Sequence, residues 1–261
     1  MEHTDFKLLQ GDCLERMAEI TDGSVDLTVT SPPYDNLRTY NGTLNDWTPE
    51  KWQAIIRELF RVTKQGGVVV WVVGDATIKG SETGTSFRQA LYAMDCGFRL
   101  HDTMIYEKVN YIPLTHNRYE QAFEFMFVFS KGRPSAFNGQ RIRSAQVKGG
   151  SAWFEADGTQ RDRHSPRGVK ETKLRPNIWR FSIGQNRNGH PATFPEALAR
   201  DHILSWSNPG DLVFDPFLGS GTTAKMALLE GRRFIGIERD EVYFNLASKR
   251  IEEASAAQKH E

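Results

Sequence analysis

Cysteine is scarce in this sequence, with only Cys13 and Cys96 among 261 residues. Two cysteines cannot form a disulfide framework or a cysteine-rich zinc site, which favours a reducing, cytoplasmic compartment. Long apolar runs are lacking as well, because the longest, Val68–Val73, is far too short to cross a bilayer. The polar, acidic start of the chain does not have the profile of a signal peptide. Membrane and secreted proteins are therefore not expected.

Net charge is also lacking, since 33 lysines and arginines balance 33 aspartates and glutamates. The balance conceals an asymmetry, because residues 131–188 hold 13 basic and four acidic side chains, a net charge of +9. The remaining chain must therefore carry −9. A basic stretch of this length with little periodicity predicts a functional or disordered insert, and a basic patch is compatible with a nucleic-acid partner.

Outside that stretch, apolar strands alternate with amphipathic helices. The pattern predicts strands at 25–30, 68–73, 103–106, 123–129, 211–214 and 233–237, and helices at 48–64, 86–94, 195–206 and 224–230, followed by a closing helix. Uninterrupted apolar strands alternating with helices are typical of an α/β fold with a mostly parallel sheet.

A tight glycine turn follows the strand at 211–214. It reads Asp215-Pro-Phe-Leu-Gly-Ser-Gly-Thr-Thr223, and Glu238 ends the next strand 17 residues beyond Gly221. Glycines let the backbone approach a ligand, and an acid at the next strand tip can accept both hydroxyls of a ribose. The pattern favours a nucleoside cofactor, with an ordinary tight turn as the alternative. A P-loop and a dinucleotide G-x-G-x-x-G fit less well, because the Gly-Lys-Ser/Thr ending is absent and Ala224 replaces the last glycine.

A second motif, Ser31-Pro-Pro-Tyr34, follows the strand at 25–30, where α/β folds place active-site loops. Consecutive prolines fix the backbone, so the Pro32 carbonyl is a rigid acceptor beside the Ser31 hydroxyl. Two acceptors and the aromatic face of Tyr34 are what an exocyclic amine on a flat base would need. Taken alone, the four residues also fit a rigid turn with a buried tyrosine; combined with the glycine turn, they favour the catalytic interpretation.

Together these motifs resemble those of the β-class DNA amino-methyltransferases, which use S-adenosylmethionine. The resemblance implies a Rossmann-like methyltransferase fold with a mostly parallel sheet, circularly permuted because the Ser-Pro-Pro-Tyr turn precedes the glycine turn. The strand beside the one that ends at Glu238 would then come from the amino terminus, near Asp12. The matching segments are Gly11-Asp-Cys-Leu-Glu15, Thr30-Ser-Pro-Pro-Tyr34, Gly189-His-Pro191, Phe194-Pro-Glu196, Asp215–Thr223 and Phe234-Ile-Gly-Ile-Glu238.

The resemblance also implies roles for individual residues. Glu238 would bind the ribose and Asp12 would approach the adenine amino group, whereas His190 has no accompanying cluster that would make it a metal ligand. The sequence departs from the family's His-Pro-Thr-x-Lys-Pro pattern at Ala192 and Phe194. The implied catalytic residues are Ser31, Pro32, Pro33 and Tyr34, and the implied cofactor contacts are Asp12, His190, Phe194, Asp215, Phe217, Gly219, Ser220, Gly221, Thr222 and Glu238.

Three regions follow from the resemblance: a catalytic half at 1–130, a target-recognition insert at 131–188 and a cofactor-binding half at 189–261. Double-stranded DNA is the expected partner, no metal is expected, and a homodimer is compatible with the family. For any single basic residue of the insert, a solvated loop is the alternative interpretation. The candidate DNA contacts are Arg38, Arg141, Arg143, Arg161, Arg163, Arg167 and Lys170.

The expected reaction is methyl transfer to an exocyclic amino group of a base flipped out of the duplex. Carbon-5 cytosine methylation is excluded, because it needs a thiolate, usually after proline, whereas Cys13 and Cys96 each follow an aspartate. Serine at position 31 favours cytosine N4, but adenine enzymes are commoner among β-class proteins, so the balance falls marginally to adenine N6. RNA or protein-amide methylation, and a DNA-binding regulator with a vestigial cofactor pocket, are the alternatives.

Overall fold

The structure is a computed structural model that describes residues 5–33, 47–111, 117–144, 152–154, 160–162, 171–182 and 195–258. The chain divides into two compact units, one formed by residues 1–138 and 177–261 and the other by residues 139–176. The second unit is shorter than the predicted insert, because residues 131–138 and 177–182 belong to the larger unit.

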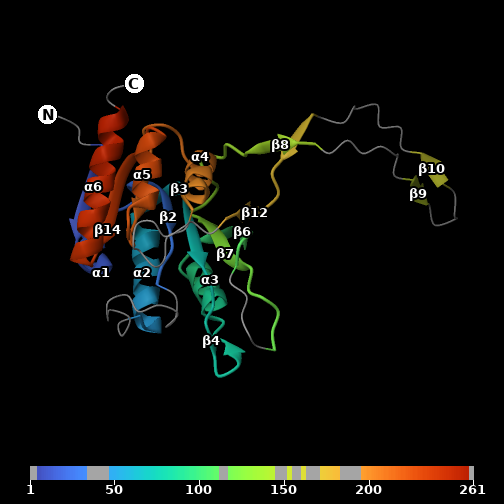
Figure 1. Ribbon diagram of the computed structural model, residues 1–261, viewed down its shortest axis with the longest axis horizontal. Coiled ribbons are helices and arrows are strands. Elements are labelled where there is room, and N and C mark those ends of the chain that lie inside the picture. Colours follow the sequence, from blue (N-terminus) through green and yellow to red (C-terminus); the bar gives the residue numbers. More distant parts are fainter. Residues whose placement is uncertain are drawn as a thin grey trace. The chain divides into compact units, whose positions relative to one another are not determined.

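An eight-stranded sheet forms the centre of the larger unit (Figure 1). Only β7 runs antiparallel to its two neighbours, so the mostly parallel sheet is confirmed. Strand β1 pairs in parallel with β14, Gln10 opposite Glu238, which confirms the permuted position of the amino-terminal strand. In spatial order the strands are β1 (Phe6–Gln10), β14 (Arg233–Glu238), β13 (Leu212–Asp215), β2 (Val25–Thr30), β3 (Thr63–Val73), β7 (Phe123–Ser130), β6 (Arg99–Lys108) and β12 (Ile178–Phe181).

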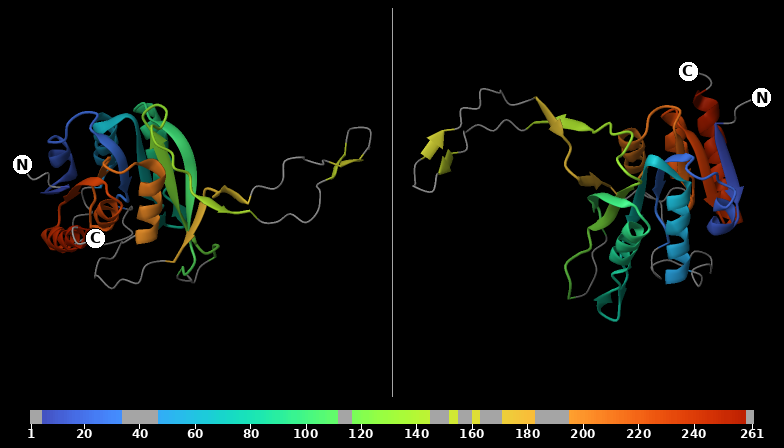
Figure 2. Two further views of the ribbon diagram at one scale, coloured as in Figure 1. Left: turned by 90° about the horizontal axis from the view of Figure 1, so that it is seen from above. Right: turned by 180° about the vertical axis from the view of Figure 1, so that it is seen from behind.

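Helices cover both faces of the sheet (Figure 2). Both faces of β3 are buried, which explains its uninterrupted apolar run. Alternate side chains of a strand point to opposite faces, and Val70 packs into one hydrophobic cluster while Trp71 packs into the other. One face carries α1 (Cys13–Met17), α2 (Pro49–Val62) and α3 (Thr85–Asp95), and the other carries α4 (Glu196–Trp206), α5 (Thr222–Leu229) and α6 (Glu241–Gln258).

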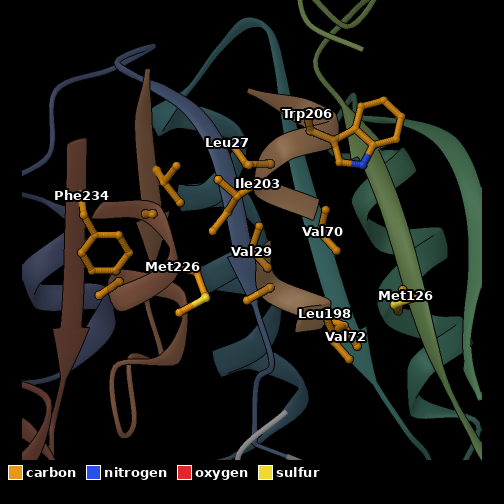
Figure 3. Close-up of a cluster of buried hydrophobic side chains, with 14 of the residues drawn as sticks. Leu27, Val29, Val70, Val72, Met126, Leu198, Ile203, Trp206, Met226 and Phe234 are labelled. Atoms are coloured by element: carbon orange, nitrogen blue, oxygen red, sulfur yellow. The ribbon is translucent and has the colours of Figure 1, made fainter. Parts of the chain in front are cut away.

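The cluster under α4 and α5 fixes the strands that lead to the two motifs (Figure 3). Leu198 and Ile203 of α4 and Met226 of α5 belong to the same cluster as Val29 of β2 and Val70 of β3, and none of the five is more than 5 % exposed. Burying a side chain of this size contributes roughly 1.5–3 kcal/mol. The ends of β2 and β13 therefore stand on a rigid layer.

Several element boundaries differ from the predictions. Helix α2 begins as predicted, with Thr48 capping the Lys51 N–H and Pro49 in the first turn, but it ends at Val62 instead of residue 64. The predicted stop at Gly66 was wrong, because β3 starts at Thr63 and the glycine pair lies within it. Gly66 has a φ of 83° and donates its N–H to the Lys131 carbonyl, which makes it a bend against the end of β7.

Two further boundaries were also predicted wrongly. Helix α5 starts at Thr222, two residues earlier than predicted, since the left-handed residue Gly221 ends the turn directly before it. Strand β6 runs over Arg99–Lys108 and not only 103–106, because its polar residues still pair along β7.

Short two-stranded elements complete the structure. In the larger unit, β4 (Thr77–Ile78) and β5 (Ser81–Glu82) form a hairpin after β3. In the second unit, β8 (Arg141–Arg143) pairs antiparallel with β11 (Thr172–Leu174), and β9 (Ala152–Phe154) pairs antiparallel with β10 (Gln160–Asp162). Among the residues that the structure describes, no helix has both the length and the apolar character of a membrane span.

Candidate active site

The candidate site lies at one edge of the sheet, where four neighbouring parallel strands end. Asp12 follows β1 by two residues, Glu238 ends β14, Asp215 ends β13, and Ser31 directly follows β2. Because β1, β14, β13 and β2 are adjacent and parallel, their carboxyl ends share this edge. Open α/β sheets bind ligands at such an edge, so the topology brings both sequence motifs to one place.

The glycine turn between β13 and α5 is tight and favours glycine at two positions. Gly219 and Gly221 have φ angles of 53° and 82°, in the left-handed region that favours glycine. A Cβ added at Gly221 would lie 3.2 Å from the Cβ of Ala247 on α6. The Leu218 N–H donates to the Ile237 carbonyl at 2.9 Å, which holds the turn against β14.

Glu238 stands at the tip of β14 with its carboxylate beside this turn. One oxygen, Oε2, accepts from the Gly219 N–H at 2.7 Å, and Oε1 accepts from the Asp240 N–H at 2.8 Å. Burial raises the pKa of Glu238 above its ordinary value. A carboxylate can accept about four hydrogen bonds, so acceptor capacity remains for a ligand hydroxyl.

Asp215 lies inside the protein at 2 % exposure. Its Oδ1 accepts from the Thr30 hydroxyl at 2.6 Å and from the Phe217 N–H at 3.0 Å. Burial raises the pKa of Asp215 to about 6. The carboxylate therefore ties the last residue of β2, directly before Ser31, to the first residues of the glycine turn.

Asp12 caps the amino terminus of α1 and meets a lysine from α2. Its Oδ1 accepts from the Leu14 N–H at 2.9 Å, and its Oδ2 pairs with Lys51 Nζ at 2.7 Å. Partial burial alone would raise the pKa of Asp12, but the hydrogen bonds from Lys51 and Leu14 lower it below the ordinary value. The carboxylate is thus held ionised at the strand end next to Glu238.

Of the other predicted residues of the glycine turn, one contacts aromatic rings and two are buried. The Phe217 ring contacts Trp47 and Trp71 edge to face, with centroids 5.6 and 6.3 Å apart. Ser220 is 3 % exposed and its hydroxyl accepts from Arg250 Nη1 of α6 at 3.0 Å, so that side chain faces the protein interior. Thr222 is buried as the first residue of α5.

The Ser31-Pro-Pro turn is described only as far as Pro33, with Pro32 buried and its two neighbours half-buried. Arg141 and Arg143 lie on β8, and Arg161 lies on β10. The remaining predicted site residues fall outside the described part of the chain: Tyr34, Arg38, Arg163, Arg167, Lys170, His190 and Phe194.

Sequence reasoning missed Thr30 and Lys51. Thr30 stands next to Ser31 of the predicted catalytic motif, but its partner Asp215 is 185 positions away. Lys51 reaches Asp12 over 39 positions from the first turn of α2, and no local pattern announces that pair. In the described parts of the chain, no group of three or more His, Cys, Asp or Glu side chains is arranged to hold a metal ion.

The residues present suit a nucleoside cofactor. Two carboxyl groups come from adjacent strand ends, β1 and β14, on one side of a glycine turn that follows the next strand, β13. The carboxyl oxygens of Glu238 and Asp12 match ribose hydroxyls and an exocyclic amine, both of which are hydrogen-bond donors. Phe217 adds an apolar wall to the same turn.

Comparison with known proteins agrees with this chemistry. A family model for N6/N4 methyltransferases, described as DNA methylase, matches residues 25–249. The orphan methyltransferase M.BamHII of Bacillus amyloliquefaciens is 51 % identical over 244 residues, 89 % of this chain and 90 % of that protein. The DNA adenine methyltransferase YhdJ of Escherichia coli K12 is 29 % identical over 255 residues, 95 % of this chain and 83 % of that protein.

Solved structures share the fold. The PvuII DNA methyltransferase, described as cytosine-N4-specific, superposes with a TM-score of 0.71 at 21 % identity and covers 98 % of this chain and 92 % of its own. TTHA0409 of Thermus thermophilus, a putative DNA modification methylase complexed with S-adenosyl-L-methionine, has a TM-score of 0.65 at 26 % identity and covers 95 % of each chain. The chain belongs to the N6/N4 DNA methylase family, the DNA amino-methyltransferases that use S-adenosylmethionine.

Proposed function

We propose that the chain methylates the exocyclic amino group of a base that it has flipped out of double-stranded DNA. One observation carries the proposal: the Thr30 hydroxyl binds Asp215 at 2.6 Å, which fixes the Ser31-Pro-Pro turn beside the glycine turn at the same sheet edge. A methyl donor and a flat acceptor base must meet with their reacting atoms in line. The exocyclic nitrogen is not accessible to such a site inside a duplex, so the base must leave the stack.

The cofactor contacts are proposed from the same geometry. Glu238 would accept the ribose hydroxyls, Asp12 the adenine amino group, and Phe217 would pack against the cofactor. S-adenosylmethionine, when bound, supplies a methyl group on a positively charged sulfur. Asp215 would support the site through its buried carboxylate, which holds the turn by accepting from the Phe217 N–H.

The catalytic turn would activate the amine by accepting its protons in hydrogen bonds. An exocyclic amine shares its lone pair with the ring and is a weak nucleophile. Acceptance of its N–H groups by the Ser31 hydroxyl and the Pro32 carbonyl favours a pyramidal nitrogen, which stabilises the transition state more than the ground state. Tyr34 would stack on the base and hold the nitrogen toward the cofactor.

Two target atoms for methylation, cytosine N4 and adenine N6, are compatible with this turn. Ser31 supplies a neutral hydroxyl, which favours cytosine N4, and the PvuII enzyme of the same fold is described as cytosine-N4-specific. The relative YhdJ is named an adenine methyltransferase, which favours adenine N6. Adenine keeps the marginal preference of the sequence prediction, and the experiment below distinguishes the two bases.

The proposal is tested by expressing the protein in cells that lack methylated adenine and cytosine, then digesting the DNA to nucleosides for mass spectrometry. N6-methyladenine or N4-methylcytosine is expected, and methylome sequencing then gives the recognition site. Ser31→Ala and Pro32→Ala should reduce the signal strongly, whereas Ser81→Ala in the exposed β5 should not. Methyl transfer to RNA or protein alone would contradict the proposal.

Lys51 provides a first quantitative prediction. Lys51→Met removes the 2.7 Å ion pair, so the partly buried Asp12 loses its main stabilising charge and its pKa rises. We expect an S-adenosylmethionine affinity about 10- to 150-fold weaker, in line with roughly 1.5–3 kcal/mol for a hydrogen bond to a charged group. The loss should be larger at pH 5.5 than at pH 8, since the lowered pKa keeps wild-type Asp12 ionised at acidic pH.

Titration calorimetry with S-adenosylmethionine at both pH values measures the effect. Lys64→Met is the matched control, because it removes another 2.7 Å lysine–aspartate pair, with Asp26, at the opposite end of β2. A Lys51→Met affinity equal to that of Lys64→Met at both pH values would show that the Lys51–Asp12 pair has no role in cofactor binding.

DNA contacts are proposed on the ribbon of β8 and β11 in the second unit. Its ladder places Arg141 opposite Leu174 and Arg143 opposite Thr172. Directly paired residues share a face of the ribbon. The two arginines therefore lie on one face, the arginine face, together with Leu174 and Thr172, and Ile142 and Lys173 lie on the other. All six residues are exposed. A two-stranded ribbon fits the major groove of B-DNA.

The arginine face is the better candidate for contact with DNA. It carries two arginines and no acid, and same-face residues two apart in a strand are about 6.8 Å apart, close to two base-pair steps of 3.4 Å. Arg141 is already engaged, since its Nε and Nη2 donate to the Thr172 hydroxyl and carbonyl at 2.8 and 2.7 Å. Arg143 is therefore the side chain that this ribbon offers to a base or phosphate.

The second prediction compares the two faces of the ribbon. Arg143→Ala should weaken binding to a cognate duplex about 5- to 150-fold, the range for roughly 1–3 kcal/mol per base-edge contact. If the contact is to phosphate instead, the slope of log affinity against log salt should fall by about 1. Lys173→Ala removes one positive charge from the other face and should change affinity less. Equal losses for both variants would contradict the assignment of the faces, while cofactor affinity should not change in either.

A further inference from the structure

A buried ion pair lies at the same sheet edge as the Ser31-Pro-Pro turn. Lys108 Nζ, at the end of β6, meets Glu124 Oε1, at the start of β7, at 2.7 Å, and their side chains are only 19 and 9 % exposed. Taking two charges out of water costs free energy that their mutual attraction often fails to recover. The backbone ladder between β6 and β7 already holds these strands together, so stability alone does not explain the pair.

The topology places this pair two strands away from the Ser31 turn. Strand β3 lies between β2 and β7, and β7 runs antiparallel to both β3 and β6. The start of β7 and the end of β6 therefore reach the edge at which β2 and β3 end. With neighbouring strands about 4.8 Å apart, β2 and β7 are separated by about 10 Å.

The side chains of the turn and of the ion pair lie on one face of the sheet. Glu124 is opposite Tyr106 in the β6–β7 register, and Lys108 follows Tyr106 by two residues, so the three share a face. Tyr106 packs in the cluster under α4 and α5, and burial together with the nearby Glu124 raises the pKa of Tyr106. Val29 of β2 belongs to the same cluster, so the alternation of β2 brings Ser31 to this face as well.

Gly74, directly after β3, carries no side chain into the space between the turn and the ion pair. Its backbone does not require glycine, because its φ is not positive. Crowding does not require it either: among the described residues beyond its chain neighbours, a Cβ added at Gly74 would meet only Glu124 Cγ within 4 Å, at 3.6 Å. A ligand that occupies this space would account for the glycine.

Under the proposed function, the ligand on this side of the turn is a flipped adenine or cytosine. In both bases a ring nitrogen that can accept a hydrogen bond stands beside the amino group, N1 in adenine and N3 in cytosine. The ammonium group of a lysine only donates hydrogen bonds, so Lys108 is complementary to that nitrogen. Thymine carries an N–H at the corresponding position, which cannot accept.

We propose that Lys108, held by Glu124, donates a hydrogen bond to the ring nitrogen beside the amino group of the flipped base and thereby selects adenine or cytosine over thymine. Gly74 gives the base its place between this lysine and the Ser31-Pro-Pro turn. Glu124 is a positioning residue, because its carboxylate orients the ammonium group and balances its charge. The inference rests on the proposed function and adds to it the atom by which the base is recognised.

The test is a double-mutant cycle between the side chain and the base. Its substrates are two synthetic duplexes with the recognition site that methylome sequencing gives, one with the natural target base and one with its deaza analogue (1-deazaadenine or 3-deazacytosine), in which a C–H group replaces the ring nitrogen. Lys108→Met combined with Glu124→Gln removes the contact without leaving an unpaired buried charge. The preference of the wild type for the natural base, measured as kcat/KM with labelled S-adenosylmethionine, should exceed that of the double variant by about 10- to 150-fold, the range for a hydrogen bond to a charged group. Effects of the analogue on the amine itself are common to both proteins and cancel.

Arg180→Met combined with Glu107→Gln is the matched control. It removes another ion pair, 2.8 Å long, between β12 and β6, and Glu107 is the residue next to Lys108, on the opposite face of the sheet. The control should prefer the natural base as strongly as the wild type. Thermal melts and the affinity for S-adenosylmethionine, which should be similar in all three proteins, verify that the variants fold.

A single variant keeps the inference testable if the double variant does not fold. Lys108→Gln retains a neutral donor, so its preference for the natural base should lie between those of the wild type and of a protein without the contact. A double variant or a Lys108→Gln variant that discriminates as strongly as the wild type overturns the inference and leaves the proposed function intact. An equal loss of preference in the Arg180→Met, Glu107→Gln control does the same, whereas a wild type that methylates no DNA overturns both.

Discussion

Glu238→Ala is expected to lower the affinity for S-adenosylmethionine by more than about 100-fold. Hydrogen bonds to a charged group contribute roughly 1.5–3 kcal/mol each, so losing two ribose contacts costs about 3–6 kcal/mol, and each 1.4 kcal/mol is a factor of ten. The substitution also removes the acceptor of the Gly219 N–H at 2.7 Å, so the glycine turn loses its tie to the tip of β14.

Titration calorimetry of three variants separates these contributions. Glu238→Gln keeps the side-chain shape and one carbonyl oxygen, so it should retain the turn contact and show an intermediate loss. Glu241→Ala, at the exposed start of α6 three residues later, removes a nearby carboxylate and should leave the affinity unchanged. An affinity within threefold of wild type for Glu238→Ala would place the ribose elsewhere. Thermal melts without cofactor show how much of any loss is due to folding.

The sequence was sufficient to predict the sheet edge at which this site lies. The glycine turn, Glu238 and Ser31-Pro-Pro each follow a strand with a strong apolar signal, and in a parallel sheet such strand ends converge. The resemblance also implied that β1 would pair with β14, as the register of Gln10 with Glu238 confirms. Local periodicity predicts each strand and the turn after it, and the order of the motifs along the chain predicts which strands are neighbours.

The contacts that hold the site together could not be predicted in the same way. Thr30 with Asp215, and Lys51 with Asp12, are pairs between side chains distant in sequence, and either aspartate could have met other donors. The interior position of Asp215 was also missed, since the family pattern identifies it only as part of the cofactor turn. Such pairings depend on the packing of β2 against β13 and of α2 against α1, which a single sequence does not specify.

The basic insert shows a similar division. Its charge of +9 and its place between the two halves could be read from the sequence. Three-residue strands such as β8 and β11 are too short to give a periodic signal, so which arginines share a face depended on the register. The register then separated Arg143 from Lys173, which composition alone treats as equivalent.

Asp215→Asn is expected to make the protein more stable at neutral pH and to remove part of its pH dependence. Burial raises the pKa of Asp215 from the ordinary 3.8 to about 6. Between these values the folded protein holds a proton that the unfolded chain has lost, so unfolding releases a proton and stability falls as pH rises. The contribution of the protonated carboxyl is complete below about pH 4 and is lost by about pH 6. At about 1.4 kcal/mol per pKa unit, the difference amounts to roughly 3 kcal/mol above pH 6.

Asparagine can keep the contacts of Asp215 without the charge. Its Oδ1 can accept from the Thr30 hydroxyl and the Phe217 N–H as the carboxylate does, and its amide can donate toward the Thr223 hydroxyl, which neighbours the carboxylate. The variant and the wild type should therefore have similar free energies of unfolding near pH 4. By pH 7 the variant should exceed the wild type by up to about 3 kcal/mol.

Urea unfolding at intervals from pH 4 to pH 8 measures both curves. Asp22→Asn is the control for the removal of an aspartate, because the Asp22 side chain is 75 % exposed and its partner Arg61 keeps its ion pair with Glu58. Some slope will remain in Asp215→Asn, since burial also raises the pKa of Glu238. A constant difference between Asp215→Asn and wild type at every pH would mean that Asp215 titrates normally. A variant less stable than wild type at pH 8 would mean that the ionised carboxylate is what holds Thr30 and the glycine turn together.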